Sequence, residues 1–224
     1  MAQTWHDLLF AHWPVPISTM RKLVPAQLEL DTRDGSSWVG VVPFWMSGVR
    51  GRGLPALPGA SQFPELNVRT YVTYSGKPGV YFFSLDAASR FAVTAARTLY
   101  HLPYFYAKMH AERHGDETLY SSVREKGEAK FCGRYKPIAS VKLRGPGTIE
   151  YWLSERYCLY TVHKEVVYRG DVHHERWPLQ DAQAEIELNS IATAAGLDLP
   201  GSDPLLHFAR HLEVAIWPLR KAGK

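Results

Sequence analysis

The chain has 224 residues, of which 46% are hydrophobic and 21% are charged. These are ordinary values for a globular protein, and they exclude an intrinsically disordered chain. The formal net charge is +4, but lysine and arginine are spread among aspartate and glutamate, which argues against a nucleic-acid-binding surface.

Cellular context and domain number follow from equally simple features. Cys132 and Cys158 are too few for a disulfide scaffold. The N-terminus lacks the cationic and apolar regions of a signal peptide, and no stretch of about 18 apolar residues predicts a membrane span. We therefore expect a cytoplasmic protein with one domain over residues 1–224, bound to neither membrane nor nucleic acid.

The dominant hydrophobic period is two, which predicts strands. The strongest strand segments, in chain order, are 37–45, 65–74, 104–112, 119–125, 155–168 and 212–217. The turn sequence Gly76-Lys-Pro-Gly79 predicts a hairpin over 65–85, and residues 48–64 read as a long Gly/Pro loop.

Helical signals are fewer. Ser18 is expected to cap a helix over 19–24, Asp86 a longer helix that stops before Pro103, and a third helix is expected over 148–153. Many short strands with few helices indicate an α+β, strand-rich fold whose sheet is closed or sandwiched.

The segment 65–72 carries the strongest functional signal. Side chains alternate between the two faces of a strand, so Glu65, Asn67, Arg69 and Tyr71 share one face. An exposed strand would show the same alternation, but the neighbouring residues 80–83 are too apolar for an exposed meander. We therefore predict that this face lines an enclosed polar pocket for a small carboxylate or oxo compound.

A second polar face is expected along residues 104–112. Tyr104, Tyr106, Lys108 and His110 alternate there with apolar residues. If this face lines a cavity, a desolvated Lys108 would have a lowered pKa and could act as a nucleophile; the alternative is an ordinary surface lysine.

Metal and phosphate sites are not expected. The histidine pairs at 110/114 and 207/211 have helical metal-ligand spacing, but the first lies in a strand-like segment and the second lacks the glutamate of a metalloprotease motif. The glycines at 48, 51 and 53 are followed by prolines, which exclude the helix that a phosphate loop needs. No cofactor is expected.

Several segments in the same order resemble the YqjF-like family, known as domain of unknown function 2071. They are His12-Trp13-Pro14-Val15-Pro16, Trp38 to Phe44, Pro64 to Val72, Gly79 to Asp86, Leu102-Pro103-Tyr104, Glu155-Arg156-Tyr157 and Trp177-Pro178-Leu179. That family is grouped with acetoacetate decarboxylase, so the resemblance implies a closed β-barrel or cone around a central cavity, with a few short helices.

The resemblance also reveals a departure. Acetoacetate decarboxylases carry a Gly-Tyr-Pro-Lys-Lys stretch whose first lysine forms a Schiff base. The similar stretch here, which includes His101, places Tyr104 and Phe105 at the two lysine positions, and Glu65 corresponds to the decarboxylase's pocket glutamate.

Three functional hypotheses remain open. The first is a lyase-type enzyme without the Schiff-base lysine, in which Glu65 is the acid or base and Arg69, Asn67, Tyr71, Tyr104 and His101 contact the ligand. The second moves the Schiff base to Lys108, as in a decarboxylase or aldolase. The third is a non-catalytic binding or interaction module. Exposed aromatic residues expected near Trp177 and Trp217 leave a homo-oligomer open.

Overall fold

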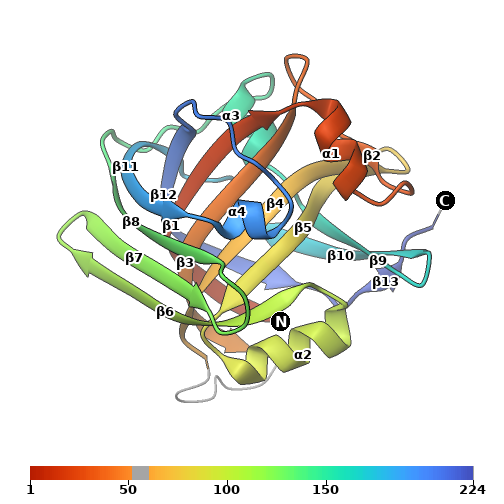
Figure 1. Ribbon diagram of the computed structural model, residues 1–224, viewed down its shortest axis with the longest axis horizontal. Helices are drawn as coiled ribbons and strands as arrows, with labels where there is room; N and C mark the ends of the chain where they lie inside the picture. The colour runs from red at the N-terminus through yellow and green to blue at the C-terminus, as the bar shows by residue number, and fades with distance from the viewer. Residues whose placement is uncertain (52–60, 224) are drawn as a thin grey trace.

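The computed structural model describes residues 1–51 and 61–223, and it is dominated by strands (Figure 1). The strands are β1 (Ala2–Val15), β2 (Glu29–Leu30), β3 (Ser37–Arg50), β4 (Phe63–Tyr74), β5 (Lys77–Ala87), β6 (Tyr104–His114), β7 (Glu117–Arg124), β8 (Lys130–Pro137), β9 (Cys158–His163), β10 (Val166–His174), β11 (Gln180–Asn189), β12 (Leu205–Ile216) and β13 (Arg220–Lys221). The helices are α1 (Ile17–Leu23), α2 (Arg90–Tyr100), α3 (Ile149–Ser154) and α4 (Ile191–Ala194). In these two ranges, no helix has the length and apolarity that crossing a membrane requires.

The sheet closes on itself. Strand pairing runs from β5 through β4, β3, β1, β12, β10 and β9 and returns to β5. A second circuit leaves this ring at β5, passes through β6, β7, β8 and β11, and rejoins it at β12. The strand-rich α+β class is thus confirmed, and closure leaves few strand edges unpaired.

Strand β4 separates two apolar layers, because its side chains alternate. Leu66, Val68 and Val72 belong to a buried cluster that also contains Tyr120 and Phe131 of the β6–β7–β8–β11 extension. The opposite face of β4 looks into the ring. The hairpin of β4 and β5 is confirmed, with its register running from Glu65 opposite Ala87 to Tyr74 opposite Lys77.

Strand β1 was missed by the sequence analysis because a bulge reverses its alternation. Asp7 has a positive φ of 48°, and the register with β3 shifts between His6 and Ala11. Trp5 therefore faces the ring interior before the bulge, and Leu8 faces it afterwards. A period of two cannot be followed across such a change.

Several element boundaries also differ from expectation. The segment 155–168 is not one strand, because Lys164 and Glu165 adopt positive φ angles and form the turn between β9 and β10. The expected loop over 48–64 is shortened, since β3 extends to residue 50 and β4 begins at residue 63; the remainder includes residues 52–60, which lie outside the described residues. The strands β8 and β11 were not foreseen.

Two of the predicted helix-capping residues were also wrong. Asp86 does not cap α2: it lies in β5 with no exposed surface, and the side chain of Ser89 accepts the capping hydrogen bond. The first helix begins after Pro16 rather than at Ser18. The third helix is confirmed, with Thr148 as its cap.

Gly79 is expected to be intolerant of any side chain. A Cβ atom built there would lie 2.7 Å from the carbonyl oxygen of Cys158 and 2.8 Å from the ring of Tyr160, on the neighbouring strand β9. We predict that Gly79→Ala lowers the free energy of unfolding by about 1–3 kcal/mol in urea titration, because a packed backbone cannot retreat. Gly201→Ala, which meets no atom within 4 Å, is the control. Equal stability of the two variants would contradict this.

Candidate functional site

A cavity of about 610 Å³ lies inside the ring of strands. One side of α2 covers it, with Phe91, Ala95 and Leu99 among its lining residues. In Figure 1, α2 lies along one edge of the fold, and the N-terminus lies close to it. Most lining side chains are apolar, so the expected polar pocket is instead an apolar cavity with a few polar groups.

The polar groups on one wall come from β4. Glu65, Asn67 and Arg69 line the cavity, and their exposed fractions are only 4%, 5% and 8%. They alternate with the buried apolar residues of the opposite face, as the sequence pattern predicted. The structure therefore brings these three predicted residues together on one wall.

Glu65 is hydrogen-bonded to Tyr104, which lies at the start of β6. The Tyr104 hydroxyl donates to Oε2 of Glu65 over 2.8 Å. Burial raises the pKa of Glu65 to about 8; the tyrosine bond opposes this rise, and the charge of Asp86 adds to it. Glu65 is therefore mainly protonated at neutral pH, while burial raises the pKa of Tyr104 well above its ordinary value.

An ion pair lies behind Glu65. Arg124 of β7 donates to Asp86 from Nη2 over 2.6 Å and from Nε over 3.1 Å, and both side chains are buried. The guanidinium carbon of Arg124 also lies 3.9 Å from the ring centroid of Phe105. This pair keeps a negative charge close to Glu65 and was not foreseen from the sequence.

Arg69 has no carboxylate partner among the described residues. Its Nε and Nη2 atoms are buried without a hydrogen bond. Its guanidinium lies over two aromatic rings, 5.4 Å from the centroid of Phe10 and 5.8 Å from that of Tyr71. A buried, unpaired cation is costly and calls for an anionic partner.

Three other buried polar atoms on the described cavity wall also lack a hydrogen-bond partner. They are the indole nitrogens of Trp5 and Trp177 and the amide oxygen of Asn67. Together with the two nitrogens of Arg69, four of these five atoms are hydrogen-bond donors. Such a wall favours a ligand that accepts hydrogen bonds.

Tyr71 lies beyond Arg69 and does not line the cavity. Its hydroxyl forms a 2.6 Å hydrogen bond with Nε2 of His12, and its ring is fully buried. Burial, followed by the charge of Arg69, lowers the pKa of His12 well below its ordinary value. Tyr71 therefore supports this end of the cavity instead of facing a ligand.

A second arginine lines the same end but is already neutralised. Arg156 pairs with Asp31 and donates from Nε to the carbonyl of Trp152 over 2.8 Å. His174 also lines the cavity, and burial lowers its pKa. Arg69 therefore remains the buried cation of the described cavity wall that has no carboxylate partner.

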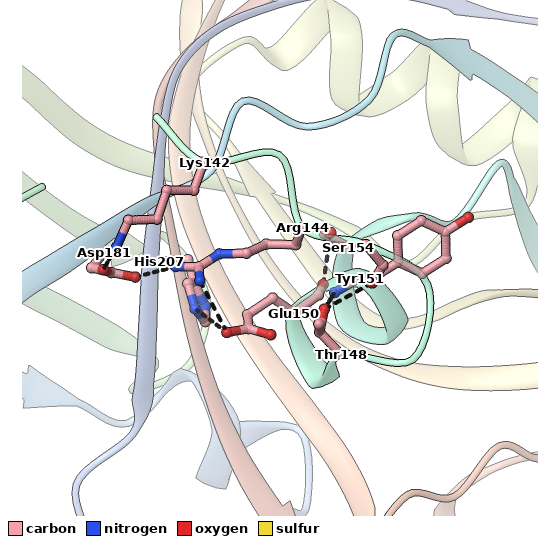
Figure 2. Close-up of polar contacts among 9 residues, drawn as sticks. Lys142, Arg144, Thr148, Glu150, Tyr151, Ser154, Asp181 and His207 are labelled. Carbon is pink, nitrogen blue, oxygen red and sulfur yellow. Dashed lines mark hydrogen bonds and ion pairs between the residues drawn. The ribbon is translucent and has the colours of Figure 1, made fainter. Parts of the chain in front are cut away.

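A polar network holds α3, which supplies Ser154 to the cavity wall (Figure 2). Arg144 bridges Asp181 and Glu150, and Glu150 also approaches His207 at 3.9 Å. The Ser154 hydroxyl donates to the carbonyl of Glu150 over 2.8 Å. The network anchors the helix from outside the cavity.

Two predicted site residues lie elsewhere. Lys108 is exposed on β6 and does not line the cavity. His101 ends α2 with a positive φ of 49°, and its ring stacks on His163 with the centroids 4.2 Å apart. The face shared by Tyr104 and Lys108 leaves the ring as β6 enters the extension, so only Tyr104 reaches the cavity. No lysine is among the described lining residues.

Comparison with known proteins settles the family. The model of domain of unknown function 2071, described as an uncharacterized conserved protein, matches residues 2–213. This chain belongs to that family. The uncharacterized protein YqjF of Bacillus subtilis (strain 168) is 54% identical to this chain over 222 residues, covering 99% of this chain and 92% of YqjF.

Solved structures share the fold of this DUF2071 member at low sequence identity. The enduracididine biosynthesis enzyme MppR aligns with a TM-score of 0.71 and 12% identity, over 99% of this chain and 87% of MppR. An acetoacetate decarboxylase from Legionella pneumophila aligns with a TM-score of 0.65 and 10% identity, over 99% and 87% of the two chains. The expected acetoacetate decarboxylase-like fold is therefore confirmed.

Most of the site outside β4 and β6 was not predicted from the sequence. Trp5 lies on the unforeseen strand β1, while Arg156, His174 and Trp177 come from segments after residue 150. Trp177, expected on an exposed aromatic surface, is buried. The available signal was the concentration of Trp, His and Arg in segments rich in apolar residues. That signal does not reveal which of them meet.

Proposed function

We propose that this protein binds an organic anion in its central cavity and acts on it by proton transfer, without a Schiff base. Arg69 holds the carboxylate of the ligand. Glu65 and Tyr104 meet a second polar group further along the ligand, such as an oxo oxygen remote from that carboxylate. This would make the protein a lyase-type relative of the acetoacetate decarboxylase-like enzymes.

The observation that carries the proposal is the state of Arg69. A guanidinium with two buried, unpartnered nitrogens matches a carboxylate, which can accept two parallel hydrogen bonds. A structural arginine would have a carboxylate or carbonyl partner, as Arg124 and Arg156 do. MppR, which shares the fold, has been solved in complex with pyruvate, a carboxylate with an oxo group.

Glu65 supplies the acid and base chemistry. A carboxyl group with a pKa of about 8 donates a proton at neutral pH and can take one back within the same cycle. Tyr104 donates to Oε2 and thereby orients the carboxyl group. The Oε1 atom makes no hydrogen bond to any described residue and is left for the ligand.

The Schiff-base alternative would require Lys108 to reach the cavity. An exposed lysine is neither desolvated nor adjacent to the polar groups of β4. Borohydride reduction in the presence of acetoacetate, followed by mass spectrometry, tests this directly. We expect no adduct on Lys108, and an adduct there would overturn the proposed mechanism.

Arg69→Met is predicted to weaken binding of pyruvate or acetoacetate by about 10- to 100-fold, because a charged hydrogen bond is lost and no other buried cation of the described cavity wall lacks a carboxylate partner. Calorimetric titration measures the loss. The matched control is Arg134→Met, because Arg134 pairs with Glu185 on an exposed face.

The test also separates enzyme from binding module. Turnover of a bound oxo acid that is lost in Glu65→Gln supports the enzyme. Arg69-dependent binding without turnover of any bound oxo acid would favour the non-catalytic module. If Arg69→Met and the wild-type protein bind pyruvate or acetoacetate with equal affinity, Arg69 is not the anion site.

A further inference from the structure

We infer that the ligand is an amphipathic carboxylate, held by its carboxylate at the deep end of the cavity and extending an apolar body past Glu65 to the mouth below α2. This inference rests on the proposed function, because it takes Arg69 as the anion site. It adds the class of the ligand, its length and its direction.

The direction follows from the pairing of β3 and β4. Moving inward from the mouth, Met46 lies opposite Phe63, then Phe44 opposite Glu65, and Gly40 opposite Arg69. Glu65 and Arg69 are four positions apart along the strand, which is about 13 Å between their Cα atoms. The anion site is thus the deeper one.

The side chains do not close this gap. The guanidinium of Arg69 lies over Phe10 and Tyr71, while Glu65 is held by Tyr104. A ligand that meets both groups must span the distance between them.

The volume of the cavity supports the same length. About 610 Å³ corresponds to roughly 20 water molecules at about 30 Å³ each. Pyruvate or acetoacetate, with six or seven heavy atoms, would occupy about a third of that space. The rest of the wall would remain in contact with water, although it is largely apolar.

The apolar wall continues to the outer surface. Phe91 and Leu99 of α2 line the mouth and are 68% and 67% exposed. Large apolar side chains so exposed at the rim of an apolar cavity gain most from a ligand that covers them. Met46 and Ile216 line the cavity near the same rim.

The charges of the buried wall favour a single anionic group inside the cavity. Arg156 is paired with Asp31, and Arg124 with Asp86. Arg69 is therefore the only buried cation of the described wall that lacks a counter-charge. Deeper than the mouth, where the exposed Arg50 also lines the cavity, a second anionic group would lie near the carboxyl group of Glu65 or in the apolar region, and both placements are unfavourable.

Calorimetric titration with straight-chain carboxylates from butanoate to dodecanoate tests the inference. We expect the dissociation constant to fall by about fourfold for each added methylene, corresponding to ~0.8 kcal/mol per buried methylene, until the cavity is filled. Octylamine, with the opposite charge, is expected not to bind, and Arg69→Met should weaken every carboxylate by a similar factor.

Leu99→Ser probes the direction of the ligand. This substitution should weaken the binding of decanoate severalfold and leave the binding of pentanoate unchanged, because only the longer chain reaches the mouth. Ile138→Ser is the matched control, since Ile138 is also exposed, at 59%, but does not line the cavity.

The outcomes separate this inference from the proposed function. If pyruvate binds in an Arg69-dependent manner but added methylenes bring no gain, the amphipathic ligand is excluded while the anion site stands. If long carboxylates bind equally well to Arg69→Met, both the direction and the anion site are wrong. If Leu99→Ser affects pentanoate and decanoate equally, the inferred direction is overturned.

Discussion

Replacing Glu65 with glutamine is expected to stabilise the protein by an amount that increases with pH. The pKa of Glu65 is raised from an ordinary value of 4.5 to about 8 by burial, so the folded state holds its proton more tightly than the unfolded state. Wild-type stability must then fall as pH rises from about 4.5 to 8, because the unfolded state loses its proton first. Glutamine does not ionise and removes this dependence.

The expected change in the free energy of unfolding is large for one side chain. The difference in free energy of unfolding between Glu65→Gln and the wild-type protein should increase by about 4 kcal/mol between about pH 5 and pH 9 and level off above pH 8. Urea unfolding of both proteins across this range measures it. Taking the difference removes the contributions of His12 and His174, whose lowered pKa values act in the opposite direction.

Glu213→Gln is the control for this comparison, because Glu213 is exposed on β12. Its stability should follow that of the wild-type protein throughout the pH range. Parallel curves for Glu65→Gln and the wild-type protein would show that Glu65 titrates as an ordinary carboxyl group, and its assignment as an acid at neutral pH would fail.

Arg124→Met is expected to destabilise the protein by about 3–5 kcal/mol, because it leaves a buried carboxylate without its partner. Asp86 has no exposed surface, and Arg124 is its ion-pair partner in the core. The double variant Asp86→Asn/Arg124→Met should recover much of this loss, since no uncompensated charge remains.

Arg134→Met provides the comparison. Arg134 forms an ion pair of similar geometry with Glu185, but at an exposed site, where such pairs contribute about 0–1 kcal/mol. Equal losses in the two arginine variants would contradict the buried-pair argument. Asp86→Asn should also lower the pKa of Glu65, because the charge of Asp86 helps to raise it; the pH dependence of stability reports this shift.

Local patterns predicted the elements whose alternation is unbroken. The face of β4 with Glu65, Asn67 and Arg69 follows from a period of two and from apolar neighbours on both sides. The hairpin of β4 and β5 follows from its turn residues, and the start of β6 from Pro103. These features depend on residues within a few positions of one another.

Other parts of the site could not be found in this way. The bulge at Asp7 reverses the alternation of β1, so neither Trp5 nor Leu8 could be assigned to the ring interior. Asp86 has the composition of a helix cap, yet a partner 38 residues away holds it in the core. The position of Lys108 depends on where β6 leaves the ring, which pairing with β7 decides.

The sequence by itself thus determined the strand-rich class, the family resemblance and the polar face of β4. Only the tertiary structure decided which charges are paired, which face the cavity and how apolar the cavity is. The physical reason is that alternation along a strand is a local property of the backbone, whereas ion pairing and enclosure arise when the ring closes and brings distant segments into contact.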